Sequence, residues 1–223
     1  MKIRLDRLLV ERGLAPTREK AQAMILAGLV TVGGRRVEKA GEGVPSDAEV
    51  EVAGPPHPYV SRGGVKLAGA LDHFGIDPRG KVCLDVGAST GGFTDCLLQR
   101  GAARVYAVDV GYGQLDAKLR NDARVVVREK VNARALSAAE VGEPIELAAV
   151  DVSFISLRLV LPAIASTLAP VPGGVPIIAL VKPQFEVGKG GTDHGVVRDP
   201  EAHRAVLRRI VEIATGLDRK SVV

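Results

Sequence analysis

The stretch from Val82 to Asp95, Val-Cys-Leu-Asp-Val-Gly-Ala-Ser-Thr-Gly-Gly-Phe-Thr-Asp, most constrains the fold of this 223-residue chain. An apolar run ends in an acid, a glycine-rich turn follows, and a segment with helical periodicity comes next. This order predicts a strand, a tight turn and a helix, the unit that lies at the ligand crevice of an open α/β sheet. The spacing of Gly87, Gly91 and Gly92 differs from the dinucleotide fingerprint, and no Lys-Ser or Lys-Thr follows as in a P-loop. The turn therefore predicts either a cofactor loop without phosphate chemistry or a turn kept for packing.

Apolar runs alternate with helical or loop segments over the second part of the chain. This alternation predicts an α/β fold, a Rossmann-like, right-handed, doubly wound parallel sheet. Aromatic residues make up only 3% of the chain and Trp is absent, so the core must consist of Ala, Val, Leu and Ile, as in a buried parallel sheet. The predicted strands are Val82–Val86, Val105–Val108, Val125–Val127, Leu147–Val150 and Ile177–Val181. The predicted flanking helices are one capped by Ser61, with Val65, Ala68, Leu71 and Phe74 on its core side, and one from Pro200 to Gly216.

The first 53 residues predict a separate, small α+β unit of two helices, a hairpin and a strand. Caps and glycines mark the ends of these elements. The landmarks are Leu5, Leu8 and Leu9 on the first helix, Gly13 at its end, Thr17 as the cap of the second, Ala21, Met24 and Ile25 on its apolar face, Gly28 at its end, the turn Gly33-Gly34, and the strand Ala48–Val52. The segment Ala53-Gly-Pro-Pro-His-Pro58 cannot continue regular structure. We therefore expect domains at 1–53 and 61–223, joined by a linker at 54–60.

Polar residues at the strand ends are the candidate ligand-binding residues, because open α/β sheets bind ligands at their carboxyl edge. Asp109 ends the second strand, 22 residues beyond Gly87, and suits both hydroxyls of a ribose; the alternative is a helix-capping acid. Asn132 follows the third strand and its amide suits an adenine edge; the alternative is a turn former. The expected cofactor-binding set is Asp85, Gly87, Ala88, Ser89, Gly91, Gly92, Asp109 and Asn132.

Two charged residues close the fourth and fifth strands. Asp151 lies in Ala-Val-Asp-Val-Ser-Phe, and Lys182 lies in Leu-Val-Lys-Pro-Gln-Phe-Glu. A Lys that closes an apolar strand needs a carboxylate partner, and Asp151 on the neighbouring strand is the expected one. Lys66 lies on the helix before the first strand, away from its apolar stripe. Taken alone, Lys66 is equally well explained as a surface lysine.

These residues carry a family resemblance. The set Lys66, Asp151 and Lys182 around the loop Asp-Val-Gly-Ala-Ser-Thr-Gly-Gly resembles FtsJ-like RNA 2′-O-methyltransferases, which use a Lys-Asp-Lys-Glu tetrad. The N-terminal pattern R-L-D-x-L-L-V-x-R-G-L, with a later G-x-V-x-V-x-G, resembles an S4-type RNA-binding module. TlyA-type proteins, also known as haemolysin A, combine the two. The chain resembles them over nearly its whole length, through the segments Ser61–Leu67, Ala107–Leu115 and Val181–Glu186.

The resemblance implies a ribosomal RNA cytidine 2′-O-methyltransferase that uses S-adenosylmethionine and acts on ribosomal RNA or ribosomal subunits. A ribose hydroxyl is a weak nucleophile and must lose its proton as it attacks the methyl group. We expect Lys182 to be the base and Asp151 to orient it. Lys66 is then the cation that favours the neutral form of the base and stabilises negative charge developing on the oxygen.

RNA binding by the first 53 residues rests on the pattern and not on net charge, since nine Lys and Arg face eight Asp and Glu there. Any basic footprint depends on how the cations are arranged in space. The alternative is a small α+β domain with a solvated charged surface. The expected RNA-binding residues are Arg4, Arg7, Arg18, Lys20, Arg35 and Arg36.

Composition limits the remaining function classes. The net charge of +4 is compatible with a nucleic-acid partner without establishing one. Cys83 and Cys96 fit small core residues in a reducing compartment, so we expect neither a disulfide nor a metal site. The N-terminus lacks a signal peptide and prolines interrupt the most apolar region, so we expect a cytoplasmic protein without a membrane partner. The alternatives are a non-catalytic RNA-binding or ribosome-assembly factor and a membrane-active haemolysin.

The end of the chain departs from the family pattern. The fourth catalytic residue of the family, a Glu, should follow the helix Pro200–Gly216, and neither Glu186 nor Glu212 matches that motif. We expect the chain to be truncated, to lack the last two strands, and to be poorly active and aggregation-prone, with family sequence ending near Leu217. The loop from Glu186 to Asp199, with Lys189, His194 and Arg198, is expected to cover the substrate and contact phosphates.

Overall fold

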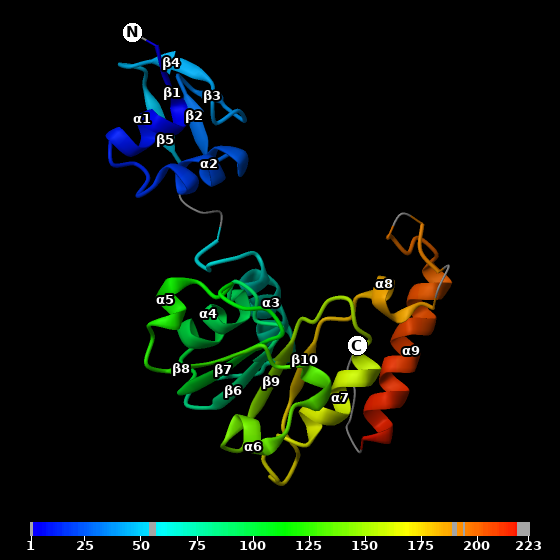
Figure 1. Cartoon of the computed structure of the whole chain (residues 1–223). Helices are drawn as coiled ribbons and strands as arrows, with labels where there is room; N and C mark the ends of the chain where they lie inside the picture. The colour runs from blue at the N-terminus through cyan, green and yellow to red at the C-terminus, as the bar shows by residue number, and fades with distance from the viewer. Residues whose placement is uncertain (1, 54–56, 189–190, 194, 218–223) are drawn as a thin grey trace. The chain divides into compact units, whose positions relative to one another are not determined.

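The protein consists of two compact units, Met1–Pro58 and Tyr59–Val223 (Figure 1). The structure is a computed structural model and describes residues 2–53, 57–188, 191–193 and 195–217. Lys189 and His194 of the expected substrate-covering loop, and residues 218–223, lie outside the described residues.

The N-terminal unit packs two helices against short antiparallel strands. Leu5, Leu8 and Leu9 are buried together with Ala21 and Ile25, as the sequence predicts. The Thr17 side chain accepts a hydrogen bond from the Lys20 amide and caps the second helix. The elements are β1 (Lys2–Arg4), α1 (Leu5–Glu11), α2 (Arg18–Leu26), β2 (Val30–Val32), β3 (Arg35–Arg36), β4 (Gly43–Pro45) and β5 (Val50–Val52).

The strands of this unit form two small sheets. The predicted hairpin pairs β2 with β3 through Gly33 and Gly34, both at positive φ, and β5 adds to the other side of β2. The antiparallel pair of β1 and β4 was not predicted from the sequence. Each of these strands has only three residues, and β4 includes Gly43 and Pro45, so neither shows a readable alternation of apolar side chains.

Asp6 is a fully buried acid at the start of α1. Its carboxylate accepts hydrogen bonds from Arg4 (3.0 and 3.1 Å), Arg18 (3.0 Å) and Gln22 (2.9 Å). The hydrogen bond from Arg4 is the largest cause that holds the pKa of Asp6 well below its usual range, with burial acting in the opposite direction. Asp6 therefore ties β1, α1 and α2 together as an anion.

We expect Asp6→Ala to destabilise the N-terminal unit by about 1–3 kcal/mol at pH 7, because buried hydrogen-bond partners are lost while the arginines can rehydrate. The pKa of Asp6 is depressed in the folded state. Its contribution to stability is therefore complete above about pH 4 and falls as pH drops toward the folded pKa. Amide exchange in α1 and α2 of the whole chain measures the effect, with exposed Asp47→Ala as control. Equal exchange in both variants at pH 7 would contradict this role.

The C-terminal unit is built on a five-stranded, fully parallel sheet, as predicted, in the order β10-β9-β6-β7-β8. The chain adds β7 and β8 on one side of β6 and then β9 and β10 on the other side. The glycine turn after β6 therefore lies at the point where a doubly wound sheet opens a crevice. The strands are β6 (Val82–Val86), β7 (Arg104–Asp109), β8 (Val125–Glu129), β9 (Leu147–Val150) and β10 (Ile177–Ala179).

Helices cover both faces of this sheet (Figure 1). Successive strand residues point to opposite faces, so Cys83 and Val105 join one core whereas Leu84 and Tyr106 join the other. One layer contains α3 (Gly63–Phe74), α4 (Gly92–Gln99) and α5 (Ala117–Arg120). The other contains α6 (Ala138–Val141), α7 (Leu157–Ala165) and α9 (Pro200–Gly216). The short elements η1 (Ala133–Ala135) and α8 (Pro183–Glu186) follow β8 and β10.

The predicted core face of α3 is wrong in part. Leu71 is buried as expected, but Leu67 is the second buried leucine, while Val65 and Phe74 are 48% and 39% exposed. Nearly every position of this helix is apolar or glycine, so its sequence allows two stripes. Packing of Gly64 against the start of α4 selects the stripe that contains Leu67.

The fifth strand ends earlier than predicted. The last backbone bond to β9 runs from the Leu180 amide to the Val150 carbonyl, because β9 itself ends at Val150. Lys182 lies beyond the strand and is the N-cap of α8. The predicted helix Pro200–Gly216 is confirmed. No helix in the described part of the chain is long and apolar enough to cross a membrane.

Candidate active site

The glycine turn is held between the ends of two neighbouring strands. The amides of Gly87 and Ala88 both donate to the Val108 carbonyl at the end of β7, at 2.9 and 3.1 Å. Gly87 has a φ of +87°, and a Cβ there would lie 2.6 Å from the Asp151 carbonyl oxygen after β9. A side chain at Gly87 would therefore displace either the turn or the backbone that carries Asp151.

The end of the turn is equally constrained. Gly91 has a φ of +97° and lies against Leu119 of α5. A Cβ on Gly92 would lie 2.2 Å from the Ser61 hydroxyl and 2.9 Å from the Gly64 amide nitrogen, so the beginnings of α3 and α4 touch through glycine. Ala88 is 7% exposed and belongs to the core on this face. The Ser61-Arg-Gly-Gly segment thus supports the turn by close backbone packing.

Asp85 is completely buried at the end of β6. Its Oδ2 accepts hydrogen bonds from the Thr94 amide (2.9 Å) and hydroxyl (2.6 Å), while its buried Oδ1 has no hydrogen-bond partner among the described residues. Burial raises the pKa of Asp85 to about 7, against the opposing effect of Thr94, and the nearby Asp151 and Asp109 charges add to the rise. An unpartnered, buried carboxylate oxygen suits a cationic or donor group of a ligand.

Asp109 ends β7 beside the turn. Its two oxygens accept hydrogen bonds from the Ser89 amide (2.8 Å) and the Gly111 amide (2.7 Å). It caps no helix: the next one, α5, is capped by Asp116. Each carboxylate oxygen can accept a further bond, so Asp109 can hold the turn and still accept from hydroxyl groups.

Asn132 is exposed and begins η1. Its side-chain oxygen accepts a hydrogen bond from the Arg134 amide at 3.1 Å, which is the turn-forming role that the sequence left open. Its amide NH₂ is still available to a ligand edge.

Lys182 and Asp151 form the expected pair across the ends of β9 and β10. Lys182 Nζ lies 2.5 Å from Asp151 Oδ1, and the two side chains are 19% and 20% exposed. The ammonium also donates to the Ser153 hydroxyl at 2.7 Å. The contact with Asp151 is an ion pair and not a hydrogen bond, since Asp151 Oδ1 accepts no hydrogen bond within the described residues. The N–H donors that Ser153 does not use are left for other acceptors, because Lys carries three donors.

Lys66 is exposed on the first turn of α3, the helix that packs against the start of α4. It forms no ion pair with any residue that the structure describes. The pair of Lys182 and Asp151 is therefore preformed, whereas Lys66 is presented to solvent from the neighbouring helix.

Two residues on the segments that follow Asp151 and Lys182 were not predicted from the sequence. Phe154 is 91% exposed, has a φ of +62°, and packs against Phe185 of α8 with ring centroids 5.1 Å apart. A large exposed aromatic with positive φ is uncommon and often marks a functional position. The available signal was an aromatic residue three positions after the candidate catalytic acid.

The second missed residue is Glu186, which is 7% exposed. It accepts hydrogen bonds from the Ser156 hydroxyl (2.6 Å) and the Leu157 amide (2.7 Å) at the start of α7. The sequence offered no signal for this contact, because its partners lie about 30 residues earlier. The description of Glu186 as part of a substrate-covering loop is therefore incomplete, since its side chain is a buried cap.

Most of the candidate RNA-binding cations in the N-terminal unit already have carboxylate partners. Lys20 is the exception: it pairs with no carboxylate among the described residues. The pairs are Arg4 and Arg18 with Asp6, Arg7 with Glu11, Arg35 with Glu42, and Arg36 with Glu38. The arginine side chains are 51–69% exposed, so their guanidinium groups can still reach a phosphate.

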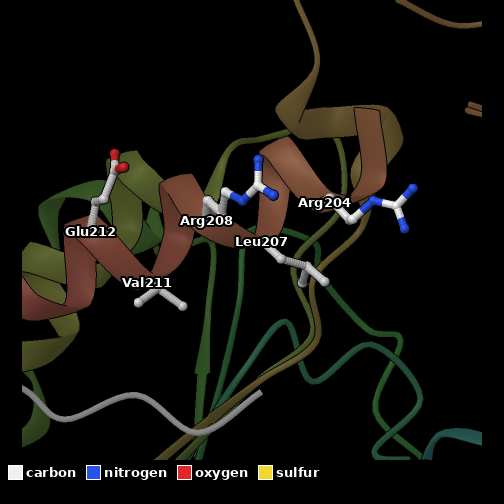
Figure 2. Close-up of a pocket in the computed structure, with 5 residues that line it drawn as sticks. All are labelled: Arg204, Leu207, Arg208, Val211 and Glu212. Atoms are coloured by element: carbon white, nitrogen blue, oxygen red, sulfur yellow. The ribbon is translucent and has the colours of Figure 1, made fainter. Parts of the chain in front are cut away.

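A separate shallow pocket lies along α9 and contains none of the candidate catalytic or cofactor residues (Figure 2). Its lining comes from one helix: Arg204, Leu207, Arg208, Val211 and Glu212. No group of three or more His, Cys, Asp or Glu suited to a metal ion occurs within the described ranges. The chemistry therefore concentrates at the carboxyl edge of the sheet.

A parallel sheet with a glycine turn after the first strand, acids at the ends of three strands and a Lys–Asp pair defines a Rossmann-like transferase with a nucleoside-containing cofactor. Comparison with known proteins gives the family. Residues 59–222 match the FtsJ-like methyltransferase family and residues 3–50 match the S4 domain. The chain belongs to the FtsJ-like, S-adenosylmethionine-dependent methyltransferases and has the S4 and methyltransferase combination of TlyA-like proteins.

Relatives match along both units. The Bacillus subtilis protein YqxC is 52% identical over 96% of this chain and 76% of its own length. The 16S/23S rRNA (cytidine-2′-O)-methyltransferase TlyA of Mycobacterium tuberculosis is 48% identical over 94% of this chain and 80% of its own length. A solved structure of a hemolysin-type protein from Streptococcus thermophilus is 44% identical, with a TM-score of 0.73, and the match covers 97% of this chain and 78% of that one.

The residues at the turn fit S-adenosylmethionine. Asp85 offers a buried, unpartnered oxygen to a positively charged ligand, and Asp109 offers acceptors to ribose hydroxyls. This fit rests on charge and hydrogen-bond acceptors, because the cofactor carries a sulfonium, an ammonium group and ribose hydroxyls.

We expect cofactor affinity to fall as pH drops through about 7. The pKa of Asp85 is raised to about 7, so its carboxylate is neutral below that pH and loses its attraction for a cationic ligand. Calorimetric titration with S-adenosylmethionine measures this change in affinity between pH 6 and pH 8. Both values lie about one unit from the pKa of Asp85. Asp85→Asn should bind more weakly and lose this pH dependence. A wild-type affinity that stays constant over this range would count against the role of Asp85.

Proposed function

We propose that the chain is a ribosomal RNA 2′-O-methyltransferase that acts on a cytidine ribose of ribosomal RNA or of a ribosomal subunit. The observation that carries the proposal is the pair of Lys182 and Asp151 beside the cofactor turn. The rRNA (cytidine-2′-O)-methyltransferase named among the relatives supports the substrate class. Because ribosomal RNA is the substrate, we assign the activity to the cytoplasm.

Lys182 acts as the base in this proposal. In its neutral form the amine has two N–H groups and one lone pair. Ser153 accepts one N–H bond and Asp151 lies at ion-pair distance from Nζ, which leaves the lone pair for the substrate hydroxyl. The 2′-hydroxyl would pass its proton to Lys182 Nζ as its oxygen bonds to the methyl carbon, and the methyl–sulfur bond of the sulfonium would break with its electron pair left on sulfur as a neutral thioether. Lys66 supplies a second cation that stabilises negative charge on the attacking oxygen.

The cofactor supplies an electrophilic methyl group on a sulfonium. The backbone of the turn, Asp85 and Asp109 would bind and orient this cofactor. Asn132 would contact its adenine. The proposed cofactor set is Asp85, Gly87, Ala88, Ser89, Gly91, Gly92, Asp109 and Asn132. Holding the methyl donor and the ribose in one geometry makes a bimolecular reaction effectively unimolecular. This positioning accounts for a large part of the rate enhancement.

The two units divide the work. We assign RNA binding to residues 1–53, through exposed cations of which Arg4 and Arg18 are pre-positioned by Asp6. Residues 61–223 carry methyl transfer, and residues 54–60 are the linker. Arginines whose orientation is fixed by a buried acid lose less side-chain entropy when they contact phosphate. The remaining proposed contacts are Arg7, Lys20, Arg35 and Arg36.

We expect Lys182→Ala to lower kcat for methyl transfer at least about 100-fold, the usual contribution of a positioned base. Transfer of a labelled methyl group from S-adenosylmethionine to ribosomal subunits measures it, and resistance of the labelled linkage to alkali identifies the 2′-O position. Cofactor affinity should stay within about threefold, because Lys182 is not in the proposed cofactor set.

Arg209→Ala, which changes an exposed cation of α9, is the matched control and should keep full activity. Absence of label transfer by the wild-type chain would overturn the proposed function. Transfer that survives Lys182→Ala unchanged would overturn the role of the base while leaving the function in place.

Phe154 supports a nucleotide as the acceptor. Its exposed ring packs against Phe185, lies three residues after Asp151 in the chain, and offers a flat apolar face. Proteins that bind unpaired nucleotides commonly stack aromatic side chains on the bases. We therefore assign Phe154 to stacking on the target base.

We expect Phe154→Ala to raise the KM for RNA, since base–aromatic stacking is worth about 1–3 kcal/mol. Phe154→Tyr should retain activity because it keeps the ring. Steady-state methyl transfer with varied RNA measures the effect, and cofactor affinity should not change. An unchanged KM for RNA in Phe154→Ala would exclude the stacking role.

A further inference from the structure

Glu186 joins the two segments that carry the catalytic pair. One segment runs from Asp151 through Phe154 to Ser156, and the other from Lys182 to Glu186. At one end the ion pair of Lys182 and Asp151 joins them. At the other end Glu186 accepts hydrogen bonds from Ser156 and from the Leu157 amide. The two segments therefore form a closed ring with a polar tie at each end and the Phe154–Phe185 contact between them.

The tie at Glu186 is well protected and compensated. The side chain is 7% exposed and pairs with no Lys or Arg in the described ranges. Its charge is met by two short hydrogen bonds and by the N-terminus of α7, where the helix dipole favours an anion. Ser156 is held from both sides, because its hydroxyl donates to Glu186 and accepts from the Arg158 amide. Such a contact fixes the backbone that leads back to Asp151.

We propose that Glu186 is a positioning residue that sets the geometry of Asp151 and Lys182 by clamping their two segments together. This role rests on the proposed function for its catalytic consequence, but its structural consequence is independent of it. Without the clamp, the loop from Asp151 to Ser156 loses its polar contacts at the Ser156 end. It then keeps the Lys182–Asp151 pair, the hydrogen bond from Lys182 to Ser153 and the Phe154–Phe185 contact. An active-site displacement of about 1 Å is enough to slow a reaction about 100-fold.

Two substitutions of Glu186 distinguish the effect of its hydrogen bonds from the effect of its negative charge. Glu186→Gln keeps the side-chain length, an acceptor for the Leu157 amide and a donor for the Ser156 oxygen, so it should retain the clamp. Glu186→Ala removes both contacts. Ile164→Ala is the control for lost stability, because Ile164 is fully buried on the same α7 and takes part in none of the polar ties that close the ring.

The experiment combines three measurements on the whole chain at a temperature where every variant is folded. Amide exchange in residues 152–157 and the rate of chemical acylation of Lys182, read by mass spectrometry, report the clamp. Steady-state methyl transfer to ribosomal subunits reports its consequence. Glu186→Ala should raise exchange and acylation and lower kcat by at least about tenfold with KM for the cofactor unchanged. Glu186→Gln and Ile164→Ala should both stay within about threefold of wild type.

The result that overturns the proposal is unchanged exchange and acylation in Glu186→Ala, or an equal loss of kcat in Ile164→Ala. If the wild-type chain transfers no methyl group, the proposed function fails. In that case exchange and acylation alone decide whether Glu186 positions the segment of Asp151 and Lys182.

Discussion

The contact between Gly87 and the backbone of Asp151 is the constraint on which the active site depends. It joins the cofactor turn after β6 to the end of β9, which carries the candidate catalytic acid. The same turn is bonded to the end of β7 through the Val108 carbonyl. Three strand ends are therefore fixed relative to one another by backbone contacts alone. Side chains on these strand ends are therefore held in fixed positions, as catalysis by positioning requires.

The features that the sequence predicted are those set by local pattern and by parallel topology. The strands Val82–Val86 and Leu147–Val150 were found to the residue, because each is a continuous apolar run between polar segments. The Lys182–Asp151 pair followed from two rules: parallel strands end at one edge, and a half-buried lysine needs a carboxylate. Neither rule depends on how the side chains of distant segments pack.

What the sequence could not predict depends on such packing. The buried face of α3 was decided by the contact of Gly64 with the start of α4, since two apolar stripes were available. The role of Glu186 as a cap for α7 depends on a partner about 30 residues away, and a lone glutamate usually lies in solvent. The exposure of Phe154 is also unusual for its residue type, and only the structure distinguishes it from an ordinary core aromatic.

The carboxyl edge gathers three aspartates, and their charges are balanced in different ways. Asp109 accepts hydrogen bonds from two backbone amides, and Asp151 pairs with the Lys182 ammonium. Asp85 is buried, and the two neighbouring charges add to the effect of burial that brings its pKa to about 7. A positively charged ligand reverses this balance, because it favours the ionised form of Asp85 and relieves the repulsion among the three acids. A sulfonium-bearing cofactor held by these acids would supply that positive charge.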